Sequence, residues 1–169
     1  MARILTSALL GVALIATAGC TKKVPPTVIA PGDNPIADTG NGGSGDADAG
    51  PLDAQFRREV VSNMVHFAFD QFDIDDEAAR ILDSQAAWLA RHPEARVTIE
   101  GHCDERGTRE YNLALGDRRA NAAKNYLAAK GISPARITTI SYGKERPIAL
   151  GSDDQSWAMN RRAVTIVIN

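Results

Sequence analysis

The stretch EGHCDERGTREYN, residues 100–112, lies between the two most informative secondary-structure signals of the chain. On its amino-terminal side, apolar and polar residues alternate through Arg96–Glu100, which predicts a β-strand ended by Gly101. On its carboxy-terminal side, apolar residues recur with a helical period from about Glu110 to Lys130, and Gly131 provides a C-terminal stop. A strand, a polar loop and a long helix in this order predict an α/β fold.

Further strands and one further helix are predicted on both sides of this unit. The predicted strands cover Met64–Phe69, Ile137–Tyr142 and Ala163–Ile168, and the predicted helix begins after Asp75 or Asp76 and ends at Arg91. The stretch Gly143–Asn160 is expected to be irregular, with a short helical turn near Trp157. The resulting βαβαββ order predicts an α/β (α+β) sandwich, in which helices pack on one side of a small mixed sheet.

Residues 1–19 predict a lipoprotein signal peptide. Arg3 supplies a positive charge, and the uncharged run Ile4–Ala18 is too short for a permanent transmembrane helix. The small residues before Cys20 resemble a bacterial lipobox, which implies that Cys20 becomes the lipidated first residue and anchors the chain. Cys20 is followed by Thr21 and not by the Asp that retains many lipoproteins in the inner membrane. We therefore expect the protein to be anchored at the periplasmic face of the outer membrane. A plain signal peptide with an incidental cysteine is the alternative.

Residues 20–54 are expected to form the lipidated N-terminus and a disordered tether. Thr21–Ala54 contains six Gly, five Pro and five Asp but no aromatic residue. Such a segment buries too little apolar surface to offset the conformational entropy that ordering would cost. Residues 55–169 then form the single folded domain, which is long enough for one modest core.

The charge distribution excludes one class of partner. The chain has 19 basic and 21 acidic side chains, of which three and five precede residue 55, so the predicted domain carries no net charge. Binding of duplex nucleic acid depends on clustered Lys and Arg, and we therefore expect no nucleic-acid partner.

The run His102-Cys103-Asp104 suggests a metal site. Neighbouring residues of an extended segment point to opposite faces, however, and no histidine stands at HExxH spacing. We therefore expect no metal and no cofactor. Because Cys20 and Cys103 are the only cysteines, a disulfide framework is also excluded. We expect Cys103 to be buried, with a reactive thiol as the alternative.

Five ordered segments resemble the family of OmpA-like C-terminal domains, which includes the peptidoglycan-associated lipoproteins. They are FDQFDI at 69–74, EGHCDERGT at 100–108, the stretch from Asn112 to Ala120, SYGKE at 141–145 and NRRAV at 160–164. The resemblance implies a non-enzymatic protein that binds peptidoglycan non-covalently through the meso-diaminopimelate of the stem peptide. It also implies that the protein tethers the outer membrane to the cell wall within a Tol-Pal system that serves envelope integrity and cell division. The chief expected Tol partner is the periplasmic propeller protein TolB.

The resemblance also implies a set of ligand-binding residues. They are Phe69, Asp70, Asp104, Arg119 and Arg162, with Asn112 shaping the site. The chemistry of the ligand fits this set, because the far end of diaminopimelate carries an ammonium and a carboxylate on one carbon. A selective site needs a fixed anion beside a fixed cation, which Asp104 and Arg119 can supply. The planar guanidinium can donate two parallel hydrogen bonds to a carboxylate.

Plainer roles are open for several of these residues. Asp104 and Arg119 can form a structural salt bridge, Phe69 can belong to the core, and Asn112 can cap the second helix. Arg161 and Arg162 can form a solvated pair or can line the cleft. Two alternative functions are a cell-wall hydrolase, although no CxxC, HExxH or GxSxG motif occurs, and an OmpA-like envelope lipoprotein outside the Tol system.

Overall fold

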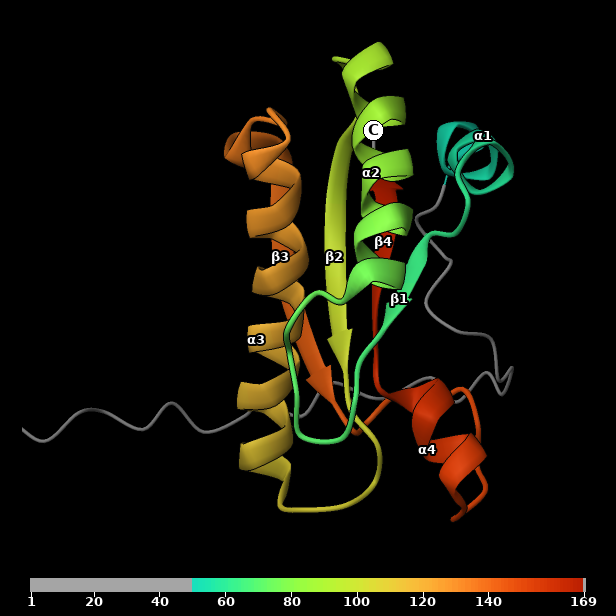
Figure 1. Cartoon of the computed structure of the whole chain (residues 1–169), viewed down its shortest axis with the longest axis vertical. Helices are drawn as coiled ribbons and strands as arrows, with labels where there is room; N and C mark the ends of the chain where they lie inside the picture. Colours follow the sequence, from blue (N-terminus) through green and yellow to red (C-terminus); the bar gives the residue numbers. More distant parts are fainter. Residues whose placement is uncertain (1–49, 169) are drawn as a thin grey trace, which may run out of the picture. The chain divides into compact units, whose positions relative to one another are not determined.

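The computed structural model describes residues 50–168. Its elements are α1 (Pro51–Glu59), β1 (Met64–His66), α2 (Asp76–Arg91), β2 (Arg96–His102), α3 (Arg109–Ala129), a 3₁₀ turn (Pro134–Arg136), β3 (Ile137–Gly143), α4 (Asp154–Asn160) and β4 (Arg162–Ile168) (Figure 1). From β1 onward the predicted βαβαββ order is confirmed, whereas α1 was not predicted. The helical turn expected near Trp157 is also present, as α4.

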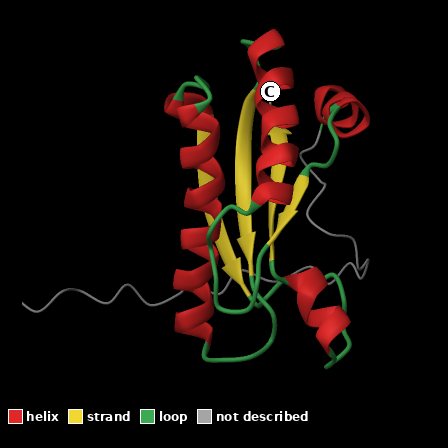
Figure 2. Ribbon diagram, in the orientation of Figure 1, coloured by secondary structure: helices red, strands yellow, loops and turns green. Residues whose placement is uncertain are grey.

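The four strands form one mixed sheet in the order β1-β4-β2-β3. β2 and β3 are parallel and are joined through α3, whereas β4 is antiparallel to both of its neighbours, β1 and β2. Figure 2 shows α2 and α3 side by side on one face of this sheet. The predicted sandwich is therefore confirmed. As a result, the carboxyl ends of β1, β2 and β3 meet the start of β4 and the start of α3 at one end of the domain (Figure 1).

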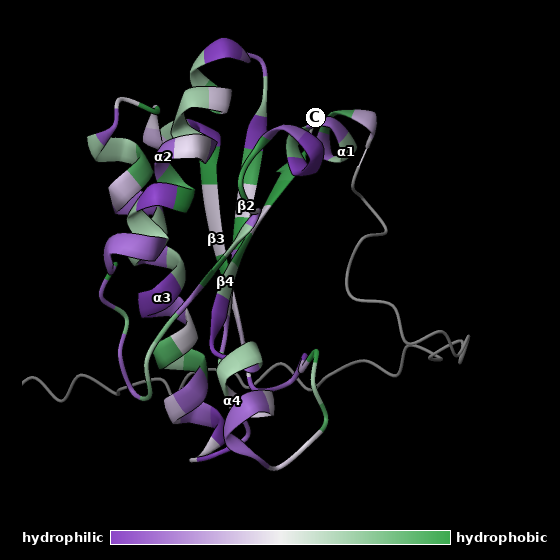
Figure 3. Ribbon diagram, turned by 45° about the vertical axis from the view of Figure 1, so that its right-hand side comes forward, coloured by the Kyte–Doolittle hydropathy of each residue, from purple (hydrophilic) through white to green (hydrophobic). Residues whose placement is uncertain are grey.

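The core fills the space between the sheet and its two covering helices. Hydrophobic residues lie along the strands where helices cover them (Figure 3). Asp75 caps α2 by accepting a hydrogen bond from the Ala78 N–H, as the sequence predicts for a residue at this position. The largest buried apolar side chains are Trp88, Phe56, Leu82, Leu89, Ile99 and Leu127.

The predicted end of the tether at residue 54 is wrong, because α1 begins at Pro51. Phe56 of α1 is fully buried and meets the Trp88 ring edge-on, with ring centroids 5.0 Å apart. The Asp53 carboxylate accepts a hydrogen bond of 2.8 Å from the Val167 N–H. Pro is well suited to the first turn of a helix, so the composition that indicates a linker also permits this start. Cys20, the signal peptide and the rest of the predicted tether lie outside the described residues.

Gly101 does not end β2, which continues to His102. Gly101 instead lies where α3 approaches the sheet most closely. A Cβ atom built on it would stand 1.8 Å from the carbonyl oxygen of Gly116, in the second turn of α3. The two glycines therefore allow the helix to lie directly against β2, which sets the position of the residues that follow on both elements.

Candidate functional site

A cavity of about 210 Å³ lies at the end of the domain where the strands β1 to β3 finish. Its walls come from the loop after β1, the loop after β2, the amino-terminal half of α3 and Arg161, which directly precedes β4. Five of the six predicted ligand-binding residues line it: Phe69, Asp70, Asp104, Asn112 and Arg119. The topology thus brings together residues that are up to 50 positions apart in the sequence.

Asp104 is the buried anion of the cavity, with only 4% of its surface exposed. Its Oδ2 accepts hydrogen bonds from Nη2 of Arg106 at 2.6 Å and from Nη1 of Arg161 at 3.3 Å. Its Oδ1 accepts from Nε and the main-chain N–H of Arg106, at 3.3 and 3.1 Å. Burial alone would raise the pKa of this carboxyl, but the hydrogen bonds from Arg106 outweigh burial and lower the pKa. Asp104 is therefore ionised at neutral pH.

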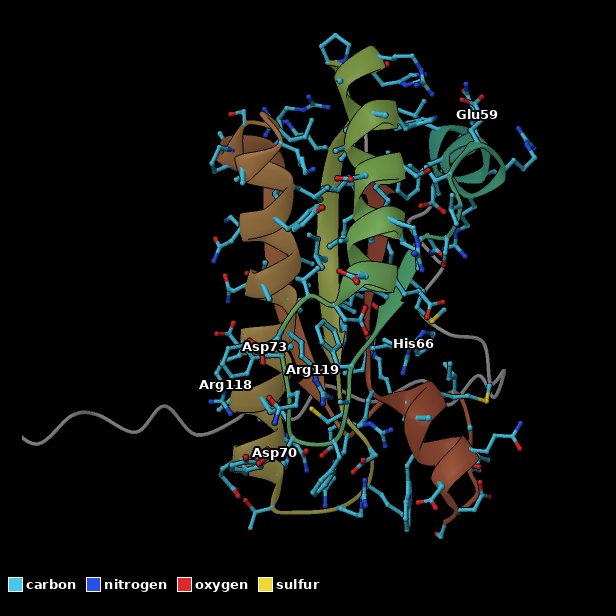
Figure 4. The ribbon with its side chains drawn as sticks, viewed as in Figure 1. Glu59, His66, Asp70, Asp73, Arg118 and Arg119 are labelled. Carbon is cyan, nitrogen blue, oxygen red and sulfur yellow. The ribbon has the colours of Figure 1, made fainter. Side chains whose placement is uncertain are left out.

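Arg119 is the buried cation, and its side chain is held by main-chain carbonyls. Its Nε, Nη1 and Nη2 donate hydrogen bonds to the carbonyl oxygens of Gln71 (2.9 Å), His102 (2.8 Å) and Ala68 (3.2 Å). It is fully buried. Burial lowers the pKa of Arg119, but a guanidinium remains protonated in proteins. Figure 4 shows Arg119 on the side of α3 that faces the sheet, close to the loop that carries Asp70.

No carboxylate among residues 50–168 forms an ion pair with Arg119, so the expected alternative of an Asp104–Arg119 salt bridge is wrong. Three of the five N–H groups of the guanidinium are used by the three carbonyls, which leaves two to donate elsewhere. Carbonyl oxygens satisfy these donors but do not neutralise the positive charge. A buried charge without a direct ion pair is costly, and the carboxylates of Asp70 and Asp104 in the same cavity act on Arg119 without pairing with it.

Phe69 and Asp70 form one side of the cavity mouth. Phe69 is 60% exposed, so its alternative assignment to the core is wrong: β1 ends at His66 and the chain turns away from the sheet. Asp70 has a positive φ of 57°, and its carboxylate accepts a hydrogen bond from the Tyr111 hydroxyl. This hydrogen bond is the main reason that the pKa of Tyr111 is raised. An exposed ring and a neighbouring carboxylate thus flank the entrance.

Asn112 shapes the loop after β2. Its side-chain amide donates hydrogen bonds to the carbonyls of Arg106 (2.8 Å) and Thr108 (3.0 Å), so it holds that loop closed over the start of α3. The helix is capped by Thr108, which accepts from the Tyr111 N–H, and the alternative of Asn112 as the cap is therefore wrong. The main-chain carbonyl of Asn112 accepts a weak hydrogen bond of 3.3 Å from the Cys103 thiol.

Cys103 is buried, as predicted, and lies in the cavity wall. Burial raises the pKa of its thiol, which keeps the group protonated and unreactive at neutral pH. His102 packs on the other side of the strand, where its ring stacks on Tyr142 with centroids 5.6 Å apart. Its Nε2 lies 3.4 Å from the Glu100 carboxylate, without the alignment of a hydrogen bond. In residues 50–168, no three His, Cys, Asp or Glu side chains gather where they could hold a metal ion.

The prediction that Arg162 binds the ligand is not supported by the geometry, because Arg161 lines the cavity in its place. Alternate residues of an extended chain point to opposite sides, and Arg162 points away from the cavity. It is buried there, donates to the carbonyls of Asn160 and Arg146, and has its pKa lowered to about 10 by burial. Arg161 donates instead to Asp104 and to the Phe67 carbonyl.

Arg106 and Tyr111 line the cavity but were not predicted, whereas Arg161 lines it in agreement with one of the two alternatives for the Arg161-Arg162 pair. Arg106 follows Asp104 by two positions in a tight loop, and Tyr111 follows the Thr108 cap by three, so both spacings were visible in the sequence. Asp104 follows the end of β2 and Arg161 precedes the start of the antiparallel strand β4, 57 positions later, so no local pattern indicates their contact.

Comparison with known proteins identifies the class of this domain. Residues 66–161 match the OmpA family. The chain is 46% identical over 154 residues to a peptidoglycan-associated lipoprotein of Mesorhizobium japonicum, covering 91% of this chain and 86% of the relative. It is 45% identical over 154 residues to a peptidoglycan-associated lipoprotein of Agrobacterium fabrum, covering 90% of this chain and 82% of the relative. The chain therefore belongs to the OmpA family and, within it, to the peptidoglycan-associated lipoproteins, as the sequence motifs indicate.

Solved structures agree with this assignment. The crystal structure of the peptidoglycan-associated lipoprotein from Burkholderia pseudomallei is 43% identical, with a TM-score of 0.61 over 63% of this chain and 90% of that chain. A MotB-like protein from Desulfovibrio vulgaris, 24% identical with a TM-score of 0.53 over 60% of this chain and 66% of that chain, shares the fold. Among the described helices, none is long and apolar enough to cross a membrane.

Proposed function

We propose that this protein binds peptidoglycan non-covalently and holds the meso-diaminopimelate of the stem peptide in the cavity described above. The observation that carries the proposal is that Asp104 and Arg119 line one cavity but do not neutralise each other. A ligand that presents an ammonium and a carboxylate on one carbon matches this pair of charges. The names of the relatives, which are peptidoglycan-associated lipoproteins, support the same ligand.

Each group of the site has a role in this binding. The ligand ammonium donates to the Asp104 carboxylate, and the ligand carboxylate accepts from the two N–H groups of Arg119 that the carbonyls leave free. The exposed ring of Phe69 covers the aliphatic part of the ligand side chain. Because Arg119 and Arg161 are already held by main-chain carbonyls, these two side chains lose little conformational entropy when the ligand enters.

The site favours binding over hydrolysis of the cell wall. A thiol nucleophile needs a base within hydrogen-bond distance, but the Cys103 thiol donates to a main-chain carbonyl and its pKa is raised by burial. The adjacent His102 ring lies on the other side of the strand, stacked on Tyr142. We therefore propose a binding protein that cuts no bond.

In the cell, the proposed role is to tether the outer membrane to the wall. Cys20 would carry the lipid anchor at the periplasmic face of the outer membrane, and the folded domain would reach the peptidoglycan. We further propose that the protein takes part in a Tol-Pal system, with TolB as partner, and hence in envelope integrity and cell division, as the resemblance of its motifs to the peptidoglycan-associated lipoproteins implies. The alternative is an envelope lipoprotein of this family that acts outside the Tol system.

Sedimentation with isolated sacculi tests the proposal. The wild-type chain is expected to sediment with sacculi, and Asp104→Asn and Arg119→Gln are expected to lose roughly tenfold or more in affinity, since charged hydrogen bonds are lost. Arg118→Gln removes the same charge from an exposed position of α3 and serves as the matched control. If both site variants sediment like the wild type, the site assignment is wrong. Release of soluble muropeptides by the wild type would indicate a hydrolase instead.

A further inference from the structure

We propose that Arg106 is an exchangeable internal ligand of Asp104, which the ammonium of the incoming head group must displace. Arg106 thereby determines specificity, because only a ligand that brings its own cation can take its place. This inference rests on the proposed function, since it concerns how the same cavity selects its ligand.

In the free protein, Arg106 already occupies the position that a ligand cation requires. Its guanidinium donates to both oxygens of the Asp104 carboxylate, with contacts of 2.6 and 3.3 Å. The side chain of Asp104 is 5% exposed and that of Arg106 is 35% exposed, so the guanidinium lies on the solvent side of the carboxylate. A ligand ammonium cannot reach the carboxylate from the solvent side while the guanidinium stays there.

Arg106 is also held between two aromatic rings at the cavity mouth. Its Cζ lies 4.2 Å from the centre of the Phe69 ring and 4.1 Å from the centre of the Trp157 ring. The two rings come from the loop after β1 and from α4, so the guanidinium joins two otherwise separate segments. The Trp157 indole is itself fixed by donating to the Glu105 carboxylate at 3.0 Å. The stack is therefore a defined position that Arg106 can occupy or leave.

Of the two arginines on Asp104, Arg106 is the one that can be exchanged. Arg161 is anchored by a second hydrogen bond, from its Nε to the Phe67 carbonyl at 3.0 Å, and its side chain is only 15% exposed. Within the described part of the chain, the guanidinium of Arg106 donates hydrogen bonds to Asp104 alone. When the ligand binds, the Asp104 carboxylate thus keeps its contact with Arg161 and loses its contact with Arg106.

Two measurable consequences follow from this exchange. A ligand that lacks the side-chain amino group cannot replace Arg106 and binds poorly to the wild type. A ligand that does replace Arg106 removes a cation from the face of Trp157, and the indole emission changes as the site fills. Trp88, the other tryptophan, is fully buried in the core and provides a constant background.

The test is a titration of the full chain with two muropeptides, followed by both calorimetry and tryptophan emission. One muropeptide contains meso-diaminopimelate, and the other contains its analogue without the side-chain amino group. We expect Arg106→Gln to bind the first about fivefold more tightly than the wild type, because an ion pair at a partly exposed position no longer competes. Arg106→Lys keeps a cation but loses the two-point contact and the stack, so its affinity is expected to lie between those of the wild type and of Arg106→Gln. Trp157→Phe is expected to abolish the emission change.

The matched control is Arg109→Gln, because Arg109 is an exposed arginine of the same segment that pairs with Glu145 at 3.3 Å and does not touch Asp104. It is expected to bind like the wild type. Weaker binding by Arg106→Gln, comparable to that of Asp104→Asn, would overturn the inference, because Arg106 would then support the ligand. An unchanged emission during calorimetrically normal binding would overturn it as well. If the wild type binds neither muropeptide, the proposed function itself is wrong.

Discussion

Asp104 and Arg119 face one cavity, yet each is held by partners other than the other. The Asp104 carboxylate is bound by Arg106 and Arg161, and the Arg119 guanidinium by three main-chain carbonyls. Direct pairing would cancel the two charges against each other. In the observed arrangement Arg119 has no carboxylate partner among residues 50–168, whereas Asp104 is paired with the anchored Arg161 and with Arg106, the partner that we propose the ligand displaces.

Replacing Arg119 by Lys is expected to destabilise the fold as well as weaken binding. A lysine ammonium cannot match the planar fork that serves the carbonyls of Gln71, His102 and Ala68, and carbonyls left unpaired in a buried site are costly. We expect a loss of about 3 kcal/mol in the free energy of unfolding, measured by urea denaturation. Arg118 is the exposed neighbour of Arg119 and provides the control, because Arg118→Lys should change the free energy of unfolding by about 0.5 kcal/mol or less. Equal effects of the two substitutions would contradict the assigned role.

The affinity for peptidoglycan is expected to be independent of pH from 7 to about 5 and to fall in stronger acid. Hydrogen bonds from Arg106 hold the pKa of Asp104 below its ordinary value of 3.8, so the carboxylate stays ionised until the pH approaches that lowered pKa. The ionised Asp104 carboxylate also stabilises the fold. This contribution is fully present above the ordinary pKa of 3.8 and is lost as the pH falls through the lowered pKa of the folded chain. Calorimetric titrations between pH 7 and 3 measure the effect. A large loss of affinity already between pH 7 and 6 would indicate a histidine as the controlling group.

The stability of the fold is expected to fall as the pH drops below about 6.5, the ordinary pKa of histidine. Burial lowers the pKa of His102, although the neighbouring Glu100 opposes this shift, so the ring stays neutral in the folded chain. Below the ordinary pKa the unfolded chain binds a proton that the folded chain does not, which favours unfolding by up to about 1.4 kcal/mol per pH unit.

Urea denaturation at pH 7.5 and 5.5 tests this effect. His102→Gln is expected to lose less stability between the two pH values than the wild type does. The pH dependence of stability that remains in the variant belongs to His66, whose pKa is also lowered by burial, and to the carboxyl groups. If the wild type loses no more stability between pH 7.5 and 5.5 than His102→Gln does, His102 does not cause the pH dependence.

Gly101→Ala is expected to displace α3 from the sheet. The added Cβ would lie 1.8 Å from the Gly116 carbonyl oxygen, which belongs to the helix backbone and cannot rotate away. Overpacking of this kind should cost about 3 kcal/mol in the free energy of unfolding, and it should weaken binding because Arg119 lies on the displaced helix. Thr138→Ser, at an exposed position of β3, is the control and should have little effect. A stable Gly101→Ala variant with normal binding would refute the close approach as the reason for this glycine.

Much of the fold could be predicted because its elements carry strong local signals. The periodicity of α2 and α3, the Asp75 cap and the alternation in β2 are properties of short segments. The start of α1 could not be predicted in this way. Its Pro51 and Asp53 have the composition of a linker, and only the contacts of Phe56 with Trp88 and of Asp53 with Val167 make the segment part of the domain.

Five of the six residues expected from the family motifs line the cavity, and the exception, Arg162, has a geometric cause. Arg161 and Arg162 are equivalent as sequence, and only the direction of the backbone entering β4 decides which of them meets Asp104. The role of Arg106 was missed for a similar reason. The stack between Phe69 and Trp157 joins the loop after β1 to α4, and no pattern in the sequence relates these two segments.

The most direct measurement of the central claim compares three stem-peptide ligands by calorimetry with the wild-type chain. One carries meso-diaminopimelate, one lacks only the side-chain carboxylate, and one lacks only the side-chain amino group. If Asp104 and Arg119 each bind one charge of the head group, the removal of either charge lowers the affinity roughly tenfold or more. Equal affinity for all three ligands would contradict recognition of the zwitterion in this cavity.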